Sequence, residues 1–150
     1  MPDQTIKIII TAILILHGIA HGRAFFALVT QATSGQAGGW LPLRAWWYPN
    51  LSLKAASWIA SAFWLLSTLA FFAAGLSLWG LLEWGNTWRQ LAIAGAVVST
   101  LGSLLFSGIW PGAPTRKMSD LDTVISLVIN VAIFIALLWL DWPPLDMFGI

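Results

Sequence analysis

Apolar residues run along this chain in four long segments that are nearly free of charged side chains. The segments cover residues 6–29, 53–79, 88–109 and 121–140. Each reaches the roughly 20 residues that an α-helix needs to cross the hydrocarbon core of a bilayer. The pattern therefore predicts an all-α membrane protein in which four transmembrane helices form a bundle, as a single domain over residues 1–150.

The first break between these segments is long and aromatic. Residues 31–50 contain three glycines, two prolines and four Trp or Tyr residues. Because Trp and Tyr favour the level of the lipid headgroups, this composition predicts a Trp-rich interfacial loop, with a short surface helix at residues 43–48. Asn50 or Ser52 is predicted to cap the second helix, since either side-chain oxygen can accept a hydrogen bond from a free backbone N–H.

The remaining breaks follow the rules of helix capping. Asn86 is predicted to cap the third helix, and the two prolines of WPGAPTRK end it. Ser119 and Asp122 form an S-x-x-D pattern, which predicts the start of the fourth helix. The sequence DWPP at residues 141–144 ends that helix.

Composition supports the membrane interpretation and excludes several function classes. The chain is 59% hydrophobic and 9% charged, whereas soluble domains carry roughly 25% charged residues. Eleven tryptophans suit a membrane–water interface. The absence of cysteine excludes disulfides and thiolate chemistry. A net charge of +1 without a basic run gives no basis for nucleic-acid binding.

The distribution of Lys and Arg predicts the orientation in the membrane. Five of these residues lie at the end of the bundle that holds the first and third loops: Arg23, Arg44, Lys54, Arg116 and Lys117. The opposite end holds Lys7 and Arg89. Because positive residues favour the cytoplasmic side, we expect a multi-pass protein of the plasma membrane with both termini outside the cytoplasm.

Small residues recur at helical spacing in two segments. The third segment carries a ridge in which each member follows the last by four positions: Gly95, Ser99, Ser103 and Ser107. Such a ridge predicts a close helix–helix seam, or alternatively a row of hydroxyls that lines a ligand. Gly18 and Gly22 form a second close-approach pattern, and we expect them to pack against a neighbouring helix of the same chain.

Two histidines interrupt the first apolar segment. In the stretch LHGIAHGR, His17 and His21 lie four apart on one helix face, with His17 near the middle of the span. A polar side chain at that depth needs a hydrogen-bond partner and usually faces the bundle interior. Asn130 lies near the middle of the fourth span, so we predict a hydrogen bond between His17 and Asn130.

Arg23 follows the histidines at the end of the first helix. It lies toward the side on which the fourth helix begins, where Asp122 is found. An ion pair between Arg23 and Asp122 would neutralise a charge that is unfavourable in the membrane. The alternative is that the Arg23 side chain extends to the interface.

The pair of histidines raises the question of a bound cofactor. Two imidazoles on adjacent turns do not complete a metal site, the chain has no third histidine, and its acids lie outside the span centres. No metal site is therefore predicted. A quinone, a lipid or a tetrapyrrole with one axial ligand stays open, in a pocket formed by polar residues within an apolar cavity. The candidate ligand-binding residues are His17, His21, Asn130, Ser99 and Ser103.

No catalytic motif is present. The chain lacks G-x-S-x-G, a phosphate-binding loop and HExxH, and no pair of carboxylates lies within a span. We therefore assign no catalytic residue and expect a protein that is not an enzyme.

The stretch HGIAHGR on a glycine-containing first helix, and a short fourth helix that ends before WPP, resemble the small bacterial four-helix membrane proteins grouped as DoxX-like. The resemblance extends over the whole chain in length and number of spans. It implies a bacterial membrane protein, and some members of that family are associated with quinone-linked oxidoreductases.

Two functions follow from these observations. The first is a non-enzymatic membrane protein of a bacterial plasma membrane, either an accessory or structural subunit or a lipid-binding protein. Its partners would be the lipid bilayer and other membrane subunits or further copies of the chain. The alternative is a redox-associated membrane protein that binds a quinone or a tetrapyrrole near the HxxxH of the first helix.

Overall fold

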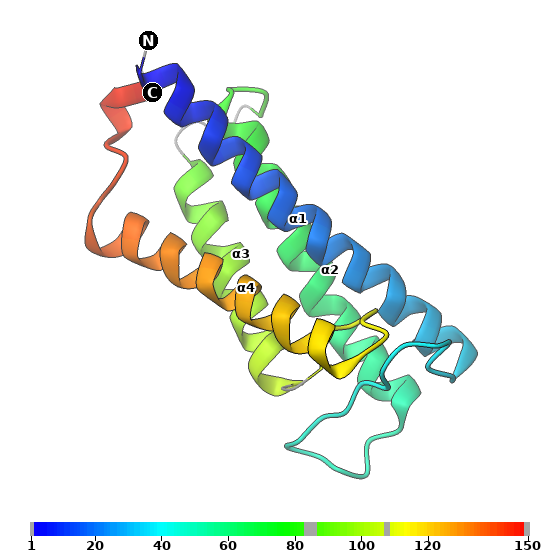
Figure 1. Cartoon of the computed structure of the whole chain (residues 1–150). Helices are drawn as coiled ribbons and strands as arrows, with labels where there is room; N and C mark the ends of the chain where they lie inside the picture. Colours follow the sequence, from blue (N-terminus) through cyan, green and yellow to red (C-terminus); the bar gives the residue numbers. More distant parts are fainter. Residues whose placement is uncertain (1, 83–86, 107–108, 149–150) are drawn as a thin grey trace.

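The computed structural model describes residues 2–82, 87–106 and 109–148 and contains four α-helices within them (Figure 1). These helices are α1 (Pro2–Ser34), α2 (Leu53–Leu78), α3 (Trp88–Leu105) and α4 (Arg116–Phe134). A π-helical turn, η2 (Ile135–Trp139), continues α4, and a short 3₁₀ helix, η3 (Leu145–Phe148), follows near the C-terminus. The all-α architecture agrees with the prediction.

Three of the described helical segments are long and apolar enough to cross a membrane: Asp3–Ser34, Leu53–Leu78 and Arg116–Trp139. α3 is not among them. It has 18 residues and a length of about 27 Å, and its first turn carries Arg89 and Gln90. It also ends at Leu105, earlier than the predicted boundary at residue 109.

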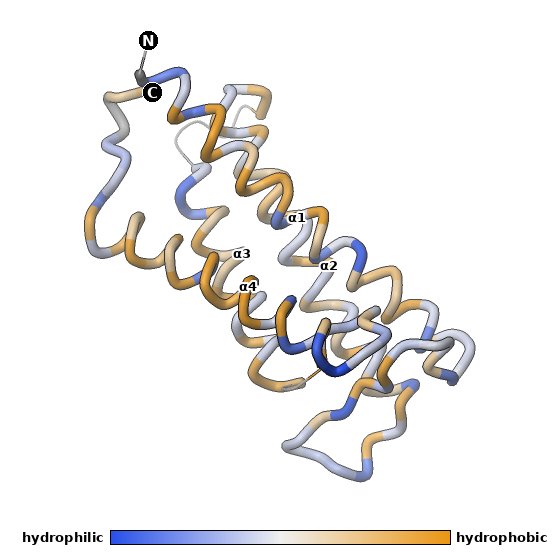
Figure 2. Tube along the Cα trace, in the orientation of Figure 1, coloured by the Kyte–Doolittle hydropathy of each residue, from blue (hydrophilic) through white to orange (hydrophobic). Residues whose placement is uncertain are grey.

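The helices pack in sequence order and leave the first and last apart. α1 lies along α2 and α2 lies along α3, whereas α4 packs more loosely on α3 and diverges from α1 (Figure 1). The N- and C-terminal ends lie at one end of the bundle, and the loop between α1 and α2 lies at the other (Figure 1). Figure 2 shows that hydrophobic positions dominate α4 and most of α1, with a few hydrophilic positions in the middle of α1.

Glycines allow α1 and α3 to approach α2 closely. A β-carbon at Gly18 would lie 3.4 Å from the Phe71 Cβ atom, and one at Gly22 would lie 3.6 Å from the Thr68 Cγ2 atom. Both glycines of the first helix therefore face a neighbour within the chain. Gly95 of α3 lies against the ring of Phe71, and a β-carbon there would lie 3.0 Å from the ring.

The rest of the predicted ridge on α3 also faces the interior. Ser99 and Ser103 are both buried. Ser107 lies outside the described residues. Close packing of this kind replaces apolar burial as the main source of helix association in lipid.

The loop between α1 and α2 contains no helix at residues 43–48, in contrast to the prediction. Leu43 and Ala45 are instead buried in the core, so the segment packs in an irregular conformation. Its polar groups bond to other elements: the Leu41 N–H donates to the Ala113 carbonyl over 3.0 Å, and the Trp46 indole donates to the Leu104 carbonyl over 2.6 Å. These two bonds attach the loop to the last turn of α3 and to the segment that precedes α4.

α2 and α4 each begin at a hydroxyl cap. Ser52 caps α2, as one of the two predicted choices, and accepts a hydrogen bond from the Ala55 N–H over 3.2 Å. The predicted start of α4 at Ser119 is wrong, because Thr115 caps that helix by accepting from the Met118 N–H.

Ser119 has a different role, because its buried hydroxyl accepts a hydrogen bond from the backbone N–H of Trp110. It therefore fixes the α3–α4 connection to the first turn of α4. The predicted cap Asn86 lies outside the described residues.

Candidate functional site

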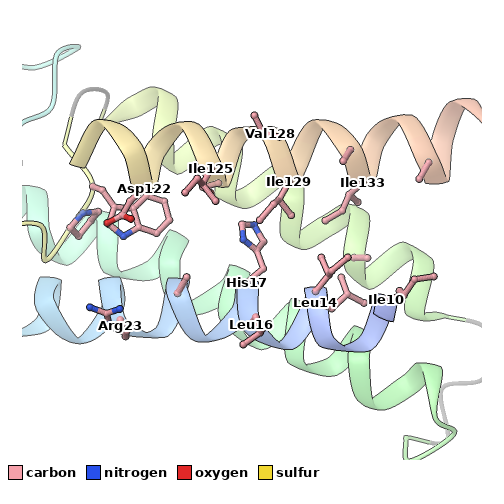
Figure 3. A pocket seen from close by; sticks show the side chains of 18 of the residues that line it. Ile10, Leu14, Leu16, His17, Arg23, Asp122, Ile125, Val128, Ile129 and Ile133 are labelled. Carbon is pink, nitrogen blue, oxygen red and sulfur yellow. The ribbon is translucent and has the colours of Figure 1, made fainter. Parts of the chain in front are cut away.

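A cavity of about 840 Å³ lies between α1 and α4 (Figure 3). It exists because α4 packs on α3 and diverges from α1, so α1 and α4 make few direct contacts with each other. Most of its wall is apolar, including Ile10 and Leu14 of α1 and Ile129 and Ile133 of α4. Its size falls within the range of small-molecule sites, roughly 300–1,000 Å³.

Polar groups lie in only part of this cavity. Figure 3 shows Arg23 and Asp122 at one end, on facing helices, and His17 near the middle, pointing from α1 toward α4. Ser126 of α4 also lines the cavity. The opposite end, around Ile10 and Ile133, is apolar (Figure 3). The cavity is therefore amphipathic along its length.

A buried hydrogen-bond network lies behind the middle of the cavity. The predicted bond between His17 and Asn130 is present, with 3.0 Å between His17 Nε2 and Asn130 Oδ1. His21 Nδ1 lies 2.9 Å from the His17 carbonyl oxygen, and His21 Nε2 lies 2.6 Å from Ser99 Oγ. The Asn130 amide nitrogen donates to Ser99 Oγ and Thr100 Oγ1 over 2.9 and 3.1 Å. The network links α1, α3 and α4.

For neutral imidazoles, these contacts assign the donors and acceptors that link His17, His21, Ser99 and Asn130. A carbonyl only accepts, so His21 Nδ1 carries the proton and His21 Nε2 accepts from the Ser99 hydroxyl. The Asn130 amide nitrogen donates to Ser99, so Asn130 Oδ1 is free to accept from the protonated Nε2 of His17. In this assignment the proton of each neutral imidazole lies on His17 Nε2 and on His21 Nδ1.

The two histidines consequently differ in what they can offer a ligand. Both ring nitrogens of His21 are engaged, and its side chain is completely buried. His17 lines the cavity, and within the described part of the chain its Nδ1 makes no hydrogen bond. His17 Nδ1 is therefore a free acceptor beside the cavity.

The structure divides the five predicted ligand-binding residues into three groups. Only His17 lines the cavity. His21, Asn130 and Ser99 form the network behind it. Ser103 is buried on α3 and takes no part in either.

The predicted ion pair between Arg23 and Asp122 is not formed. Among the described residues, the ion pairs join Arg89 to Asp141 and Arg116 to Asp120. Arg23 and Asp122 instead line the same cavity from opposite walls. The prediction failed because it placed α1 and α4 in contact at this depth, whereas the cavity separates them.

Ser126 was missed in the sequence, although a signal for it is present. Asp122, Ser126 and Asn130 follow each other at intervals of four and therefore lie on one face of α4. Together with His17 on the first helix, this polar stripe indicates that this face of α4 is directed at the bundle interior rather than at lipid. Thr100 carries no such signal, because its contact with Asn130 depends on how α3 and α4 cross.

No group of three or more His, Asp or Glu side chains that could hold a metal ion occurs among the described residues. Comparison with known proteins finds no matching family model, no matching curated protein and no matching solved structure. The resemblance to the DoxX-like proteins therefore stays a prediction, and the cavity is the feature on which a function can be based.

Proposed function

We propose that this chain is a non-enzymatic integral protein of a bacterial plasma membrane and that it binds a lipid in the cleft between α1 and α4. The observation that carries the proposal is the amphipathic cavity, which is polar at one end and apolar at the other. A lipid has the same division along its length. The few polar groups at one end would set its orientation.

The outer surface of the helices supports a membrane location. Large apolar side chains are exposed on α1, α2 and α4, including Leu69 of α2 and Val131 of α4. Such a surface is stable in hydrocarbon but not in water. We place α3 across the membrane as a fourth, shorter span, because α2 and α4 both pack against it.

The position of the cavity mouth supports entry from the bilayer. Leu16, Phe26 and Val128 line the cavity and are also 65, 69 and 62% exposed. The cavity therefore opens sideways between α1 and α4, at a surface that faces acyl chains in the proposed location. A lipid could enter without passing through water.

The distribution of positive residues sets the proposed orientation. Arg44, Lys54, Arg116 and Lys117 belong to the end of the bundle opposite the termini. Placing that end in the cytoplasm puts the polar end of the cavity in the cytoplasmic leaflet. The exposed ring of Trp46 on the first loop then lies at the same interface, as part of an aromatic belt.

The alternative function, a redox-associated protein with a quinone or tetrapyrrole, depends on a single histidine nitrogen that is free to contact a ligand. His21 has no free ring nitrogen, and His17 Nε2 already donates to Asn130. Only His17 Nδ1 is left to act as a ligand or acceptor, and it cannot donate to a quinone carbonyl. Visible absorption spectra of protein purified from its native membrane distinguish the two functions. We expect the unmodified protein and His17→Ala to have the same spectrum, whereas a bound tetrapyrrole would give an absorption band that is lost in His17→Ala.

Filling the cavity should abolish lipid binding. Ala132 is an exposed residue of α4 that lines the cavity, so Ala132→Trp places an indole in the cleft without disturbing the core. We expect the amount of phospholipid retained in native mass spectrometry to fall by about tenfold or more, since the ligand and the indole compete for the same volume.

Ala62→Trp is the matched control, because Ala62 is an exposed residue of α2 outside the cavity lining. It should bind phospholipid as the unmodified chain does, and both variants should have an unchanged circular dichroism spectrum. Equal lipid binding by Ala132→Trp and Ala62→Trp would overturn the proposed function.

A further inference from the structure

We propose that the polar end of this cavity recognises a zwitterionic phospholipid headgroup that carries a primary ammonium, with Arg23 binding the phosphate and Asp122 binding the ammonium. This inference rests on the proposed function, because it requires that the cleft holds a lipid. It goes further by naming the headgroup and the two residues that select it.

The charges at this end of the cavity are opposite in sign and do not neutralise each other. Arg23 on α1 and Asp122 on α4 line the same cavity from facing helices (Figure 3). Within the part of the chain that the structure describes, neither forms an ion pair or a hydrogen bond. Arg23 is exposed and Asp122 is partly exposed, so both charges are accessible to a ligand that enters the cavity and that carries charges of opposite sign.

A zwitterionic headgroup satisfies both charges together. An anionic headgroup would pair with Arg23 but would bring its negative charge toward Asp122. A headgroup without a net or local charge would leave both residues unpaired. A zwitterion presents a phosphate to Arg23 and an ammonium to Asp122, so its charges complement the site.

The chemistry of the two side chains suits these partners. A guanidinium can bind two phosphate oxygens at once through parallel N–H donors. A carboxylate accepts hydrogen bonds, and a primary ammonium has three N–H groups to donate. A quaternary ammonium has none, so Asp122 favours an ethanolamine headgroup over a choline headgroup.

A further polar group continues the site toward the apolar end. Ser126 lies one turn beyond Asp122, about 6 Å along α4, and lines the cavity. Its side chain is only 2% exposed, and within the described residues its hydroxyl has no hydrogen-bond partner. Its hydroxyl oxygen is enclosed by protein atoms, so the apolar part of the cavity begins just beyond Asp122. Ile129 and Ile133 then continue the wall toward the acyl chains.

The test compares headgroups on identical acyl chains. The full-length protein in mild detergent is titrated with phosphatidylethanolamine, phosphatidylcholine and phosphatidylglycerol, and bound lipid is counted by native mass spectrometry. We expect phosphatidylethanolamine to bind about tenfold more tightly than either of the others, which corresponds to one charge-assisted hydrogen bond. Stepwise N-methylation of the ethanolamine should weaken binding at each step, and this series requires no variant of the protein.

Two variants assign the charges to their partners. Asp122→Asn should lower the affinity for phosphatidylethanolamine to that for phosphatidylcholine. Arg23→Gln should lower the affinity for all three phospholipids by about tenfold, because each of them carries the phosphate. The matched controls are Arg116→Gln and Asp120→Asn, which remove charges from an exposed ion pair of α4 that does not line the cavity. Both controls should keep the order of the three lipids.

The results separate the headgroup inference from the proposed function. Equal binding of the three lipids, or an unchanged preference in Asp122→Asn, would overturn the headgroup assignment. If Ala132→Trp still abolished binding of all three, the cleft would remain a lipid site. Retention of all three lipids by Ala132→Trp would overturn the proposed function and the headgroup assignment together.

Discussion

Asn130→Leu is expected to lower the free energy of unfolding by about 2–4 kcal/mol, because it removes the residue that connects three helices. Asn130 is completely buried, accepts from His17 and donates to Ser99 and Thr100. Leucine has a similar size, so the change removes hydrogen bonds more than packing. The His17 Nε2 proton would then be buried without an acceptor. Thermal unfolding of the purified protein in detergent, followed by circular dichroism, measures the effect.

Ser126→Ala provides the matched control on the same helix. Ser126 is as deeply buried as Asn130, but within the described residues its hydroxyl has no partner. Its removal breaks no hydrogen bond and should therefore leave the free energy of unfolding unchanged or slightly raised. Thr100→Val removes one acceptor and should cost about 1 kcal/mol. If Asn130→Leu behaved like Ser126→Ala, the network would not hold the helices together.

Phe71→Ala should be the most destabilising change in the apolar core, at about 3–5 kcal/mol. Phe71 is completely buried on α2, and its ring centroid lies 4.7 Å from that of His17 and 5.6 Å from that of His21. Gly18 lies against its Cβ atom and Gly95 against its ring. Alanine would leave a void where α1, α2 and α3 meet, and the close packing of the glycine faces would prevent the helices from filling it. The same unfolding measurement applies.

A compensating substitution tests the geometry behind this expectation. Gly95→Leu alone should also be destabilising, because its β-carbon would lie 3.0 Å from the Phe71 ring. In the double variant Phe71→Ala with Gly95→Leu, the new side chain can occupy the vacated volume. We expect the double variant to be more stable than the sum of the two single effects predicts. Strict additivity would show that Gly95 and Phe71 do not share that space.

Much of the helical framework could be predicted because its causes are local. Long apolar runs form helices wherever the backbone must satisfy its own hydrogen bonds, and prolines and hydroxyl caps end or begin them. The predicted limits of the first helix, 6–29, fell inside the observed Pro2–Ser34 because polar flanking residues continue the helix. The hydrogen bond between His17 and Asn130 could be predicted because both side chains lie near the middle of their spans. A buried polar side chain requires a hydrogen-bond partner at that depth.

The helical segments, their small-residue faces and the need of His17 for a partner could thus be predicted from local patterns. The packing of the whole helices, by contrast, decided that α4 diverges from α1, that a cavity takes the place of the predicted contact between Arg23 and Asp122, and that Ser126 lines it. It also decided that Thr115 caps α4 and that the first loop packs without a helix. The physical reason is that helix order and crossing angle depend on how whole helix surfaces fit together. Residues far apart in the chain share in that fit, and no local pattern records it.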